Sequence, residues 1–303
     1  MNDYFGNLTT ESVNEKTKHI DECSTTEILM LINEEDSLVA GAVKETIPKI
    51  AAAVDTIVDS MKRGGRLFYF GAGTSGRIGV LDASECPPTY GVDPELVQGY
   101  IAGGDTALRT AVEGSEDSEE LGESEIAKHH ITEDDVVVGI AASGRTPYVI
   151  GVIRKARKVG AYTIGVTTNS QNMLEREVDI CIAPVVGPEV VTGSTRMKSG
   201  TAQKLVLNML TTTTMIKLGK VYGNLMIDLK ASNKKLVDRA ERIFCSVTGA
   251  DKETAADFLD KAQKDTKLAI MMYLSGMESS DAKHILETNN GVLKLALKNI
   301  MRE

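Results

Sequence analysis

The stretch RLFYFGAGTSGRIGVLDAS, residues 66–84, decides how this chain folds. Its first part, 66–70, is rich in aromatic side chains and predicts a strand. A glycine-rich loop, GAGTSG at 71–76, follows, and IGVLDAS at 78–84 continues as a helix. In a parallel α/β sheet such a loop lies at the carboxyl ends of the strands, where ligands bind and free backbone N–H groups point outward.

Four further strands are predicted in the same pattern. Each is a short β-rich run next to a loop and a helical stretch, at 96–101, 136–141, 162–167 and 179–184. Strands that alternate with helices are typical of a parallel sheet with helices on both faces. The sequence therefore predicts an α/β fold with a five-stranded parallel sheet.

Helical patterns flank the predicted sheet on both sides. Apolar side chains recur at helical spacing from about 25 to 62, and the chain beyond about 235 is helical without strand candidates. A near-continuous apolar helix at about 195–218 closes the sheet region, and we expect it to be buried against the sheet or a partner subunit. The predicted organisation is a helical N-terminal segment, an α/β domain and a small all-α C-terminal domain, at 1–56, 57–230 and 231–303.

The first glycine-rich loop formally matches the dinucleotide-binding pattern G-x-G-x-x-G. That pattern also requires an acidic residue at the end of the next strand, and strand 96–101 does not supply it. The hydroxyls of Thr74 and Ser75 suit a phosphate monoester, which has three terminal oxygens to satisfy. Gly73, Thr74 and Ser75 are therefore candidate phosphate ligands, although a tight turn with glycines for geometry alone stays open.

A second loop of this kind, ASGRTP at 142–147, follows strand 136–141. Pro147 suits the first helical position and Thr146 the N-cap, so this loop also delivers a helix N-terminus. Its candidate ligands are Ser143, Gly144, Arg145 and Thr146. Capping alone could explain these residues, but two such loops on one sheet edge favour a shared phosphate.

The pair GAGTSG and ASGRTP on a five-stranded parallel sheet resembles the sugar isomerase (SIS) domain, a flavodoxin-like fold. The second motif of that domain is Ser-x-Ser-Gly-x-Thr, and here Ala141 replaces its first serine. This departure speaks against an isomerase.

Longer runs resemble the N-acetylmuramic acid 6-phosphate etherases. They are LDASECPPTYGV (81–92), AVEGSEDS (111–118), IAASGRTPYV (140–149) and VVTGSTRMKSGTAQKLVLNML (190–210). The resemblance covers nearly the whole chain, from LTTESVN (8–14) to the helical tail. It implies a carbon–oxygen lyase that needs no cofactor and no metal.

Glu85 is the first candidate for acid–base chemistry. The helix after the first loop is expected to end by Cys86, because Pro87 and Pro88 cannot continue it. The negative end of the helix dipole would then favour the protonated carboxyl that a general acid needs. From the pattern alone, Glu85 could equally be a solvated carboxylate. The resemblance implies that it is the catalytic proton donor.

Glu116 is the second candidate, in the run EGSEDSEELGESEIAK. With Ser115 as N-cap it would lie in a first helical turn, where the dipole favours the anion. The pattern alone cannot choose it over Glu113, since charge runs are usually solvated helix faces. The resemblance implies that Glu116 is the second catalytic glutamate.

The substrate implied by the resemblance is a hexose 6-phosphate with a D-lactyl ether at carbon 3. Its cleavage by elimination and hydration would give N-acetylglucosamine 6-phosphate and D-lactate. Two alternatives stay open on the same fold, a sugar-phosphate isomerase and a sugar-phosphate-sensing regulator. Release of lactate would separate the etherase from both.

Composition excludes several partners. With 34 Lys+Arg against 43 Asp+Glu, the net charge is −9, so we expect neither nucleic acid nor an anionic membrane surface as a partner. No apolar run reaches the roughly 18 residues of a membrane span. The expected partners are a small sugar phosphate and a second copy of the chain, in a homodimer.

The cysteines and the N-terminal residues indicate a cytoplasmic protein. The polar start of the chain does not resemble a secretory signal. The four cysteines are far apart and show no C-x-x-C spacing, so we expect reduced thiols and neither disulfides nor zinc.

The sequence does not decide the roles of two cations and of one N-terminal segment. Arg196 and Lys198 could contact a substrate anion or face solvent. The segment around Thr10, Glu11 and Asn14 could cover a site in a neighbouring subunit.

Overall fold

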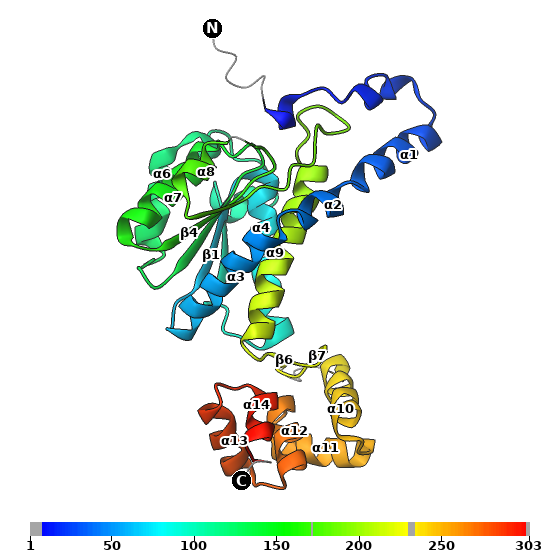
Figure 1. The fold of residues 1–303 in the computed structure, drawn as a ribbon, viewed down its shortest axis with the longest axis vertical. Coiled ribbons are helices and arrows are strands. Elements are labelled where there is room, and N and C mark those ends of the chain that lie inside the picture. Colours follow the sequence, from blue (N-terminus) through cyan, green and yellow to red (C-terminus); the bar gives the residue numbers. More distant parts are fainter. Residues whose placement is uncertain (1–7, 171, 230–233, 301–303) are drawn as a thin grey trace. The chain divides into compact units, whose positions relative to one another are not determined.

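The computed structural model describes residues 8–170, 172–229 and 234–300 (Figure 1). The chain divides into two compact units, Met1–Ser84 with Pro94–Thr211, and Glu85–Asp93 with Thr212–Glu303. The sheet belongs to the first unit and the helical C-terminal region to the second.

A parallel five-stranded sheet forms the centre of the first unit. Its strands are β1 (Leu67–Gly71), β2 (Val97–Ile101), β3 (Val136–Ile140), β4 (Tyr162–Val166) and β5 (Ile180–Ile182). They lie in the order β2-β1-β3-β4-β5, and every neighbouring pair is parallel. The strands and the fold class predicted from the sequence are confirmed.

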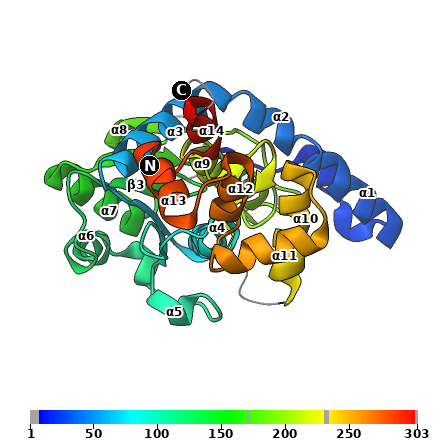
Figure 2. The same cartoon turned by 90° about the horizontal axis from the view of Figure 1, so that it is seen from below.

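Helices cover both faces of this sheet (Figures 1 and 2). One face carries α6 (Glu119–Lys128), α7 (Pro147–Val159) and α8 (Leu174–Glu177), and the other carries α3 (Ile47–Lys62), α4 (Gly73–Tyr90) and α9 (Lys198–Lys217). On the first face Phe68 and Phe70 of β1 pack with Tyr148 and Val149 of α7. Because successive strand residues point to opposite faces, a strand covered on both sides must be apolar throughout. All residues of β1 and β3 are accordingly buried.

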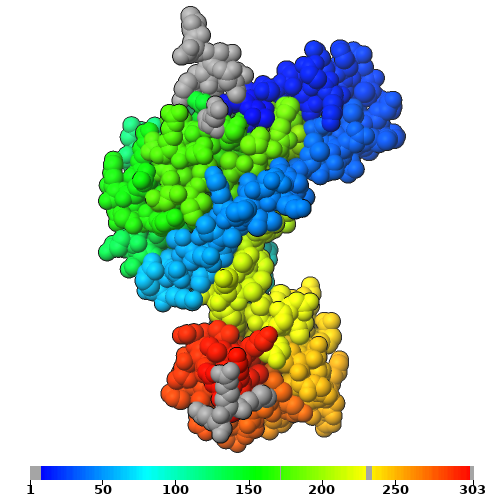
Figure 3. All heavy atoms as spheres, viewed as in Figure 1, coloured from blue at the N-terminus to red at the C-terminus, as the bar shows by residue number. Residues whose placement is uncertain are grey.

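The N-terminal segment is helical, as predicted. Its elements are η1 (Thr9–Glu11), η2 (Glu15–Thr17), η3 (Ile20–Glu22), α1 (Thr25–Asp36) and α2 (Val39–Lys44). A capping box between Ser24 and Glu27 begins α1. Figure 3 shows α1 and α2 in dark blue at the surface. After β2 come α5 (Gly104–Ala107) and the turn η4 (Ser115–Asp117).

The prediction that the helix after the first loop ends by Cys86 is wrong. α4 runs to Tyr90 with Pro87 and Pro88 inside it. Two prolines remove two N–H donors, but they lie in the last turn, where few further bonds depend on them. The N–H group of Gly91 still donates to the Pro87 carbonyl at 2.9 Å. Glu85 therefore lies more than one turn before the helix end, beyond the range at which the dipole acts strongly.

The second unit is a small helical domain preceded by a short hairpin. Its helices are α10 (Lys234–Thr248), α11 (Lys252–Lys261), α12 (Thr266–Ser275), α13 (Ser279–Thr288) and α14 (Leu293–Ile300). They bury a core around Phe244, Leu259 and Met271. β6 (Val221–Tyr222) and β7 (Leu225–Met226) form the antiparallel hairpin, which the sequence did not predict because two-residue strands show no alternation. None of the described helices combines the length and apolar character needed to cross a membrane.

A buried carboxyl group joins β1, α4 and α9 in the first unit. Asp82 is 6% exposed and accepts hydrogen bonds from Tyr69 Oη at 3.1 Å, Asn208 Nδ2 at 2.6 Å and Thr211 Oγ1 at 3.2 Å. Burial raises the pKa of Asp82 above its ordinary value, and these three hydrogen bonds offset the rise only in part. The ionised carboxylate is thus less favourable in the folded chain than in water.

This raised pKa predicts a pH-dependent stability difference between Asp82→Asn and the wild type. The folded wild type holds the Asp82 proton more tightly than the unfolded chain, so its stability falls as pH rises from the ordinary pKa of 3.8 through the folded value. The asparagine side chain does not titrate. The free energy of unfolding of the variant, minus that of the wild type, should therefore increase with pH across this window. Urea unfolding at several pH values measures it, and a difference that is constant with pH would contradict it.

Candidate active site

The two glycine-rich loops leave the sheet side by side. β1 and β3 are neighbours at its centre, and Gly71 at the end of β1 pairs with Ile140 at the end of β3. In this strand order the chain runs outward from β1 to one edge and from β3 to the other, which makes their carboxyl ends the topological switch point. Loops 71–76 and 142–146 therefore border the place where open α/β sheets bind ligands.

The first loop opens directly into α4. Gly73 has a φ of 52°, in the left-handed region that favours glycine. A Cβ on Gly76 would lie 2.6 Å from Cγ1 of Ile101, so only glycine lets α4 approach β2 so closely. Gly73, Thr74 and Ser75 occupy the first turn of α4, where backbone N–H groups have no acceptor inside the helix. Such groups can bind an anion.

The second loop is shaped by Gly144 and Ser143. Gly144 has a φ of 67°, and a Cβ there would lie 2.5 Å from Cβ of Asn172. The hydroxyl oxygen of Ser143 accepts a hydrogen bond from the N–H group of Arg145 at 3.2 Å and keeps its own proton for another acceptor. Thr146 is the N-cap residue of α7 and Pro147 its first residue, as predicted, but the Thr146 hydroxyl makes no capping bond. The helix thus leaves this hydroxyl for other partners.

A buried carboxylate holds the start of α9 beside these loops. Glu189 is fully buried, and its two oxygens accept the N–H groups of Lys198 and Ser199, each at 2.9 Å. The hydroxyl of Thr168 donates to the carbonyl of Ala142 in the second loop, at 3.1 Å. Because a hydroxyl has one proton, Thr168 Oγ1 accepts from the Ser199 hydroxyl, which lies 3.0 Å away. The N-terminal turn of α9 is therefore tied to the second loop.

Lys198 is neither a solvent-facing cation nor an exposed anion ligand. Its side chain is 1% exposed, and Nζ lies 2.6 Å from Oε2 of Glu35 on α1. Lys16 contacts the other oxygen of Glu35 at 3.3 Å. Arg196 is exposed. The buried pair of Lys198 and Glu35 attaches α1 to the start of α9.

The N-terminal segment reaches the second loop of its own chain. The N–H group of Thr10 donates to Asn169 Oδ1 at 3.3 Å, and Asn169 Nδ2 donates to Thr10 Oγ1 at 3.2 Å. Asn169 Nδ2 also donates to the Ala142 carbonyl at 2.8 Å. Asn14 lies at 3.5 Å from the carbonyl of Pro188. Sequence reasoning did not identify Asn169, since an asparagine after a strand has no distinctive spacing.

Both candidate carboxylates are exposed. Glu85 lies on α4 and Glu116 on η4. The prediction that Ser115 caps the helix is wrong, because its hydroxyl donates to the Val112 carbonyl at 2.8 Å while Ser118 caps α6 by accepting from Leu121 N–H at 3.0 Å. Gly114, with a φ of 72°, starts the separate turn η4 that precedes α6. Glu116 therefore lies outside α6, in a turn that packs against α7.

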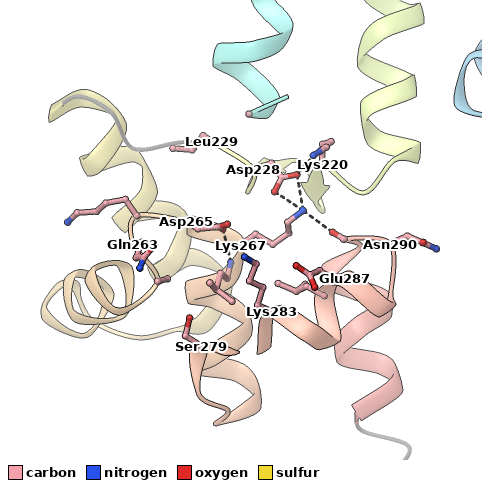
Figure 4. A pocket seen from close by; sticks show the side chains of 16 residues that line it. Lys220, Asp228, Leu229, Gln263, Asp265, Lys267, Ser279, Lys283, Glu287 and Asn290 are labelled. Carbon is pink, nitrogen blue, oxygen red and sulfur yellow. Dashed lines mark hydrogen bonds and ion pairs between the residues drawn. The ribbon is translucent and has the colours of Figure 1, made fainter. Parts of the chain in front are cut away.

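A cavity of about 930 Å³ lies within the second unit (Figure 4). On its wall Lys267 Nζ donates to Asp228 Oδ2 and to the Gly291 carbonyl, both at 2.8 Å, and Lys220 Nζ lies 2.9 Å from Asp228 Oδ2. These bonds join the segment after β7 to α12 and to the turn before α14. None of the site residues predicted from the sequence lines this cavity.

Comparison with known families agrees with the fold. The model of the glucokinase regulatory protein N-terminal SIS domain matches residues 49–157, and that of the SIS domain matches residues 113–213. Among solved structures, a phosphoheptose isomerase from Francisella tularensis aligns with a TM-score of 0.50 at 20% identity, over 64% of this chain and 100% of its own. One from Neisseria gonorrhoeae aligns with a TM-score of 0.50 at 16% identity, over 63% and 98%.

Curated relatives are similar over nearly the whole chain. The N-acetylmuramic acid 6-phosphate etherase of Clostridium beijerinckii is 58% identical over 97% of this chain and 97% of its own length. The protein of the same name from Clostridioides difficile is 54% identical over 97% of each chain. That from an Enterobacter species is 52% identical over 97% of this chain and 99% of its own.

Proposed function

Because this chain belongs to the N-acetylmuramic acid 6-phosphate etherase family, we propose that it cleaves the lactyl ether of N-acetylmuramic acid 6-phosphate. The products are N-acetylglucosamine 6-phosphate and D-lactate, which makes the reaction that of a carbon–oxygen lyase. The observation that carries the proposal is the pair of glycine-rich loops at the switch point between β1 and β3, in a chain that matches these relatives over about 97% of its length.

The loops are proposed to hold the 6-phosphate. The residues at their helix starts are Gly73, Thr74 and Ser75 in the first loop and Ser143, Gly144, Arg145 and Thr146 in the second. Backbone N–H groups, hydroxyl donors and two helix N-termini together suit a dianion. An anchored phosphate orients the sugar, so that binding energy far from the reacting atoms lowers the barrier to the chemical step.

The proposed chemistry uses Glu85 and Glu116 in turn. Ring opening exposes an aldehyde at carbon 1, which acidifies the hydrogen on carbon 2. Glu116 removes that proton, the bond from carbon 3 to the lactyl oxygen breaks, and Glu85 protonates the departing oxygen. Water then adds to carbon 3 and a proton returns to carbon 2. No metal and no cofactor takes part in this proposal.

We also propose that the protein is a cytoplasmic homodimer. All four cysteines are free thiols, which suits a reducing compartment. On α1 the apolar side chains of Leu29 and Met30 are 61% and 59% exposed. Exposed apolar side chains of this size on one helix favour a protein contact, and a second copy of the chain is the simplest partner.

Substitution of either glutamate should abolish most of the activity. Glu85→Gln and Glu116→Gln should each lower turnover at least about 100-fold, since a general acid or base contributes that much. Both should keep their affinity for sugar phosphate, because neither residue belongs to the loops. The measurement is D-lactate release from N-acetylmuramic acid 6-phosphate. Glu113→Gln, an exposed neighbour of Glu116, is the matched control and should react at the wild-type rate. Wild-type turnover in either test variant would remove that residue from the mechanism.

Isotopes from the solvent should report the elimination. In deuterated water the product should carry deuterium at carbon 2, because the proton removed there is replaced by one that exchanges with solvent. In oxygen-18 water the label should enter the carbon 3 hydroxyl of the sugar and be absent from lactate. An isomerase would release no lactate, and a regulator would label nothing. Oxygen-18 in lactate would mean attack on the lactyl side and would exclude the elimination.

Light scattering tests the oligomeric state. The purified chain, at micromolar concentration, should have about twice its own mass of 32.6 kDa. A double variant with glutamate at Leu29 and Met30 should shift toward monomer if α1 forms the contact. A wild-type monomer would contradict the homodimer.

A further inference from the structure

We infer that Gln203 is a positioning residue that controls whether the Ser75 hydroxyl can donate a hydrogen bond to the substrate phosphate. This inference rests on the proposed phosphate site and adds a residue to it. Gln203 lies on α9, one turn after the residues that Glu189 anchors. Its side chain is directed at the first loop, where α9 packs closely enough that a Cβ on Gly200 would lie 3.4 Å from Cγ2 of Thr74.

The contact between Gln203 and Ser75 places the serine proton away from a ligand. Ser75 Oγ donates to Gln203 Oε1 at 2.9 Å. Ser75 is 7% exposed and Gln203 is 1% exposed. A hydroxyl has one proton to donate. While Gln203 accepts that proton, Ser75 can offer an anion only its lone pairs, which repel it.

The same arrangement leaves the amide of Gln203 incompletely bonded. Its Nε2 is buried and makes no hydrogen bond to any described residue. A buried donor without a partner is costly, and a buried N–H group is less often left unpaired than a carbonyl oxygen. A half-turn of the amide about its last carbon–carbon bond exchanges the two atoms. Nε2 then faces Ser75 and donates to its oxygen.

The half-turn releases the Ser75 proton. With its oxygen accepting from Gln203, the hydroxyl can donate to a phosphate oxygen at the start of α4. The number of hydrogen bonds at Ser75 rises from one to two only when an anion is present to accept. Phosphate binding and the orientation of Gln203 are therefore coupled, and the start of α9 becomes part of the phosphate site without touching the ligand.

The test measures the dissociation constant of N-acetylglucosamine 6-phosphate by calorimetry in single and double variants. Gln203→Met preserves the length of the side chain but removes the Nε2 donor that would hold the Ser75 oxygen while its proton faces the phosphate, so the hydroxyl is no longer oriented in the bound state and binding should weaken about tenfold. Added to Ser75→Ala, the same substitution should cost less than about twofold more, because Gln203 acts through Ser75. Added to Ser143→Ala, it should still cost the full factor. A merely structural role would give the same factor in both backgrounds and would overturn the inference.

Two further variants keep the result interpretable. Thr214→Val removes a fully buried hydroxyl from α9 that makes no hydrogen bond to a described residue, and it should leave affinity unchanged. The carboxylate of Gln203→Glu can only accept hydrogen bonds when ionised, so this variant should weaken binding at least as much as Ser75→Ala. It remains informative if the methionine variant does not fold.

Unchanged affinity in both Ser75→Ala and Ser143→Ala would refute the phosphate site itself. Weakened binding in those two with wild-type affinity in Gln203→Met would refute only the role of Gln203.

Discussion

The parallel pairing of β1 with β3 is the constraint on which the site depends. Gly71 and Ile140 end their strands in register, so the two loops that follow start from adjacent positions on one sheet edge. Because the connections then run to opposite edges, no helix of either connection crosses the gap between them. Two helix N-termini meet there, and an anion placed between them interacts with both dipoles. A sheet with β1 at its edge would separate the loops and lose the proposed shared phosphate site.

Buried polar and charged side chains hold the start of α9 in place. Glu189 has no exposed surface, and its two carboxyl oxygens accept hydrogen bonds from two N–H groups at the start of α9. Lys198 and Glu35 form a second buried pair beside it. Replacing a buried pair with apolar residues often costs nothing in stability, whereas removing one partner is strongly destabilising. Such groups therefore contribute little net stability, but they fix the geometry around them. Here they fix the positions of Gln203 and Ser199.

The sequence predicted the sheet and both loops because their signals are local. An apolar strand, a glycine-rich turn and a helix start can each be recognised within about six residues.

The predictions from the sequence were wrong or missing in two situations. In one, a helix tolerates the loss of a few backbone hydrogen bonds near its end; in the other, a side chain is buried by partners far away in the sequence. A pair of prolines usually ends a helix, yet Pro87 and Pro88 are tolerated in the last turn of α4. Ser115 and Ser118 are equivalent caps in the sequence, and only the turn made by Gly114 separates them. Gln203 and Lys198 appear as polar residues at the start of a helix, and the partners that bury them lie 128 and 163 residues away.

A chain with a net charge of −9 must bind a dianionic substrate through groups that lie close to it, because its overall charge repels an anion. At physiological salt the charges are screened over about 8 Å, so the overall negative field reaches the site only weakly. Within that distance the loops offer neutral donors, namely backbone N–H groups and hydroxyls, with Arg145 as the nearby cation of the second loop. Neutral donors bind an anion only if their protons point at it. A hydroxyl whose proton is held elsewhere contributes repulsion, so the proposed orientation of Ser75 would matter more in this acidic chain than beside a cluster of lysines.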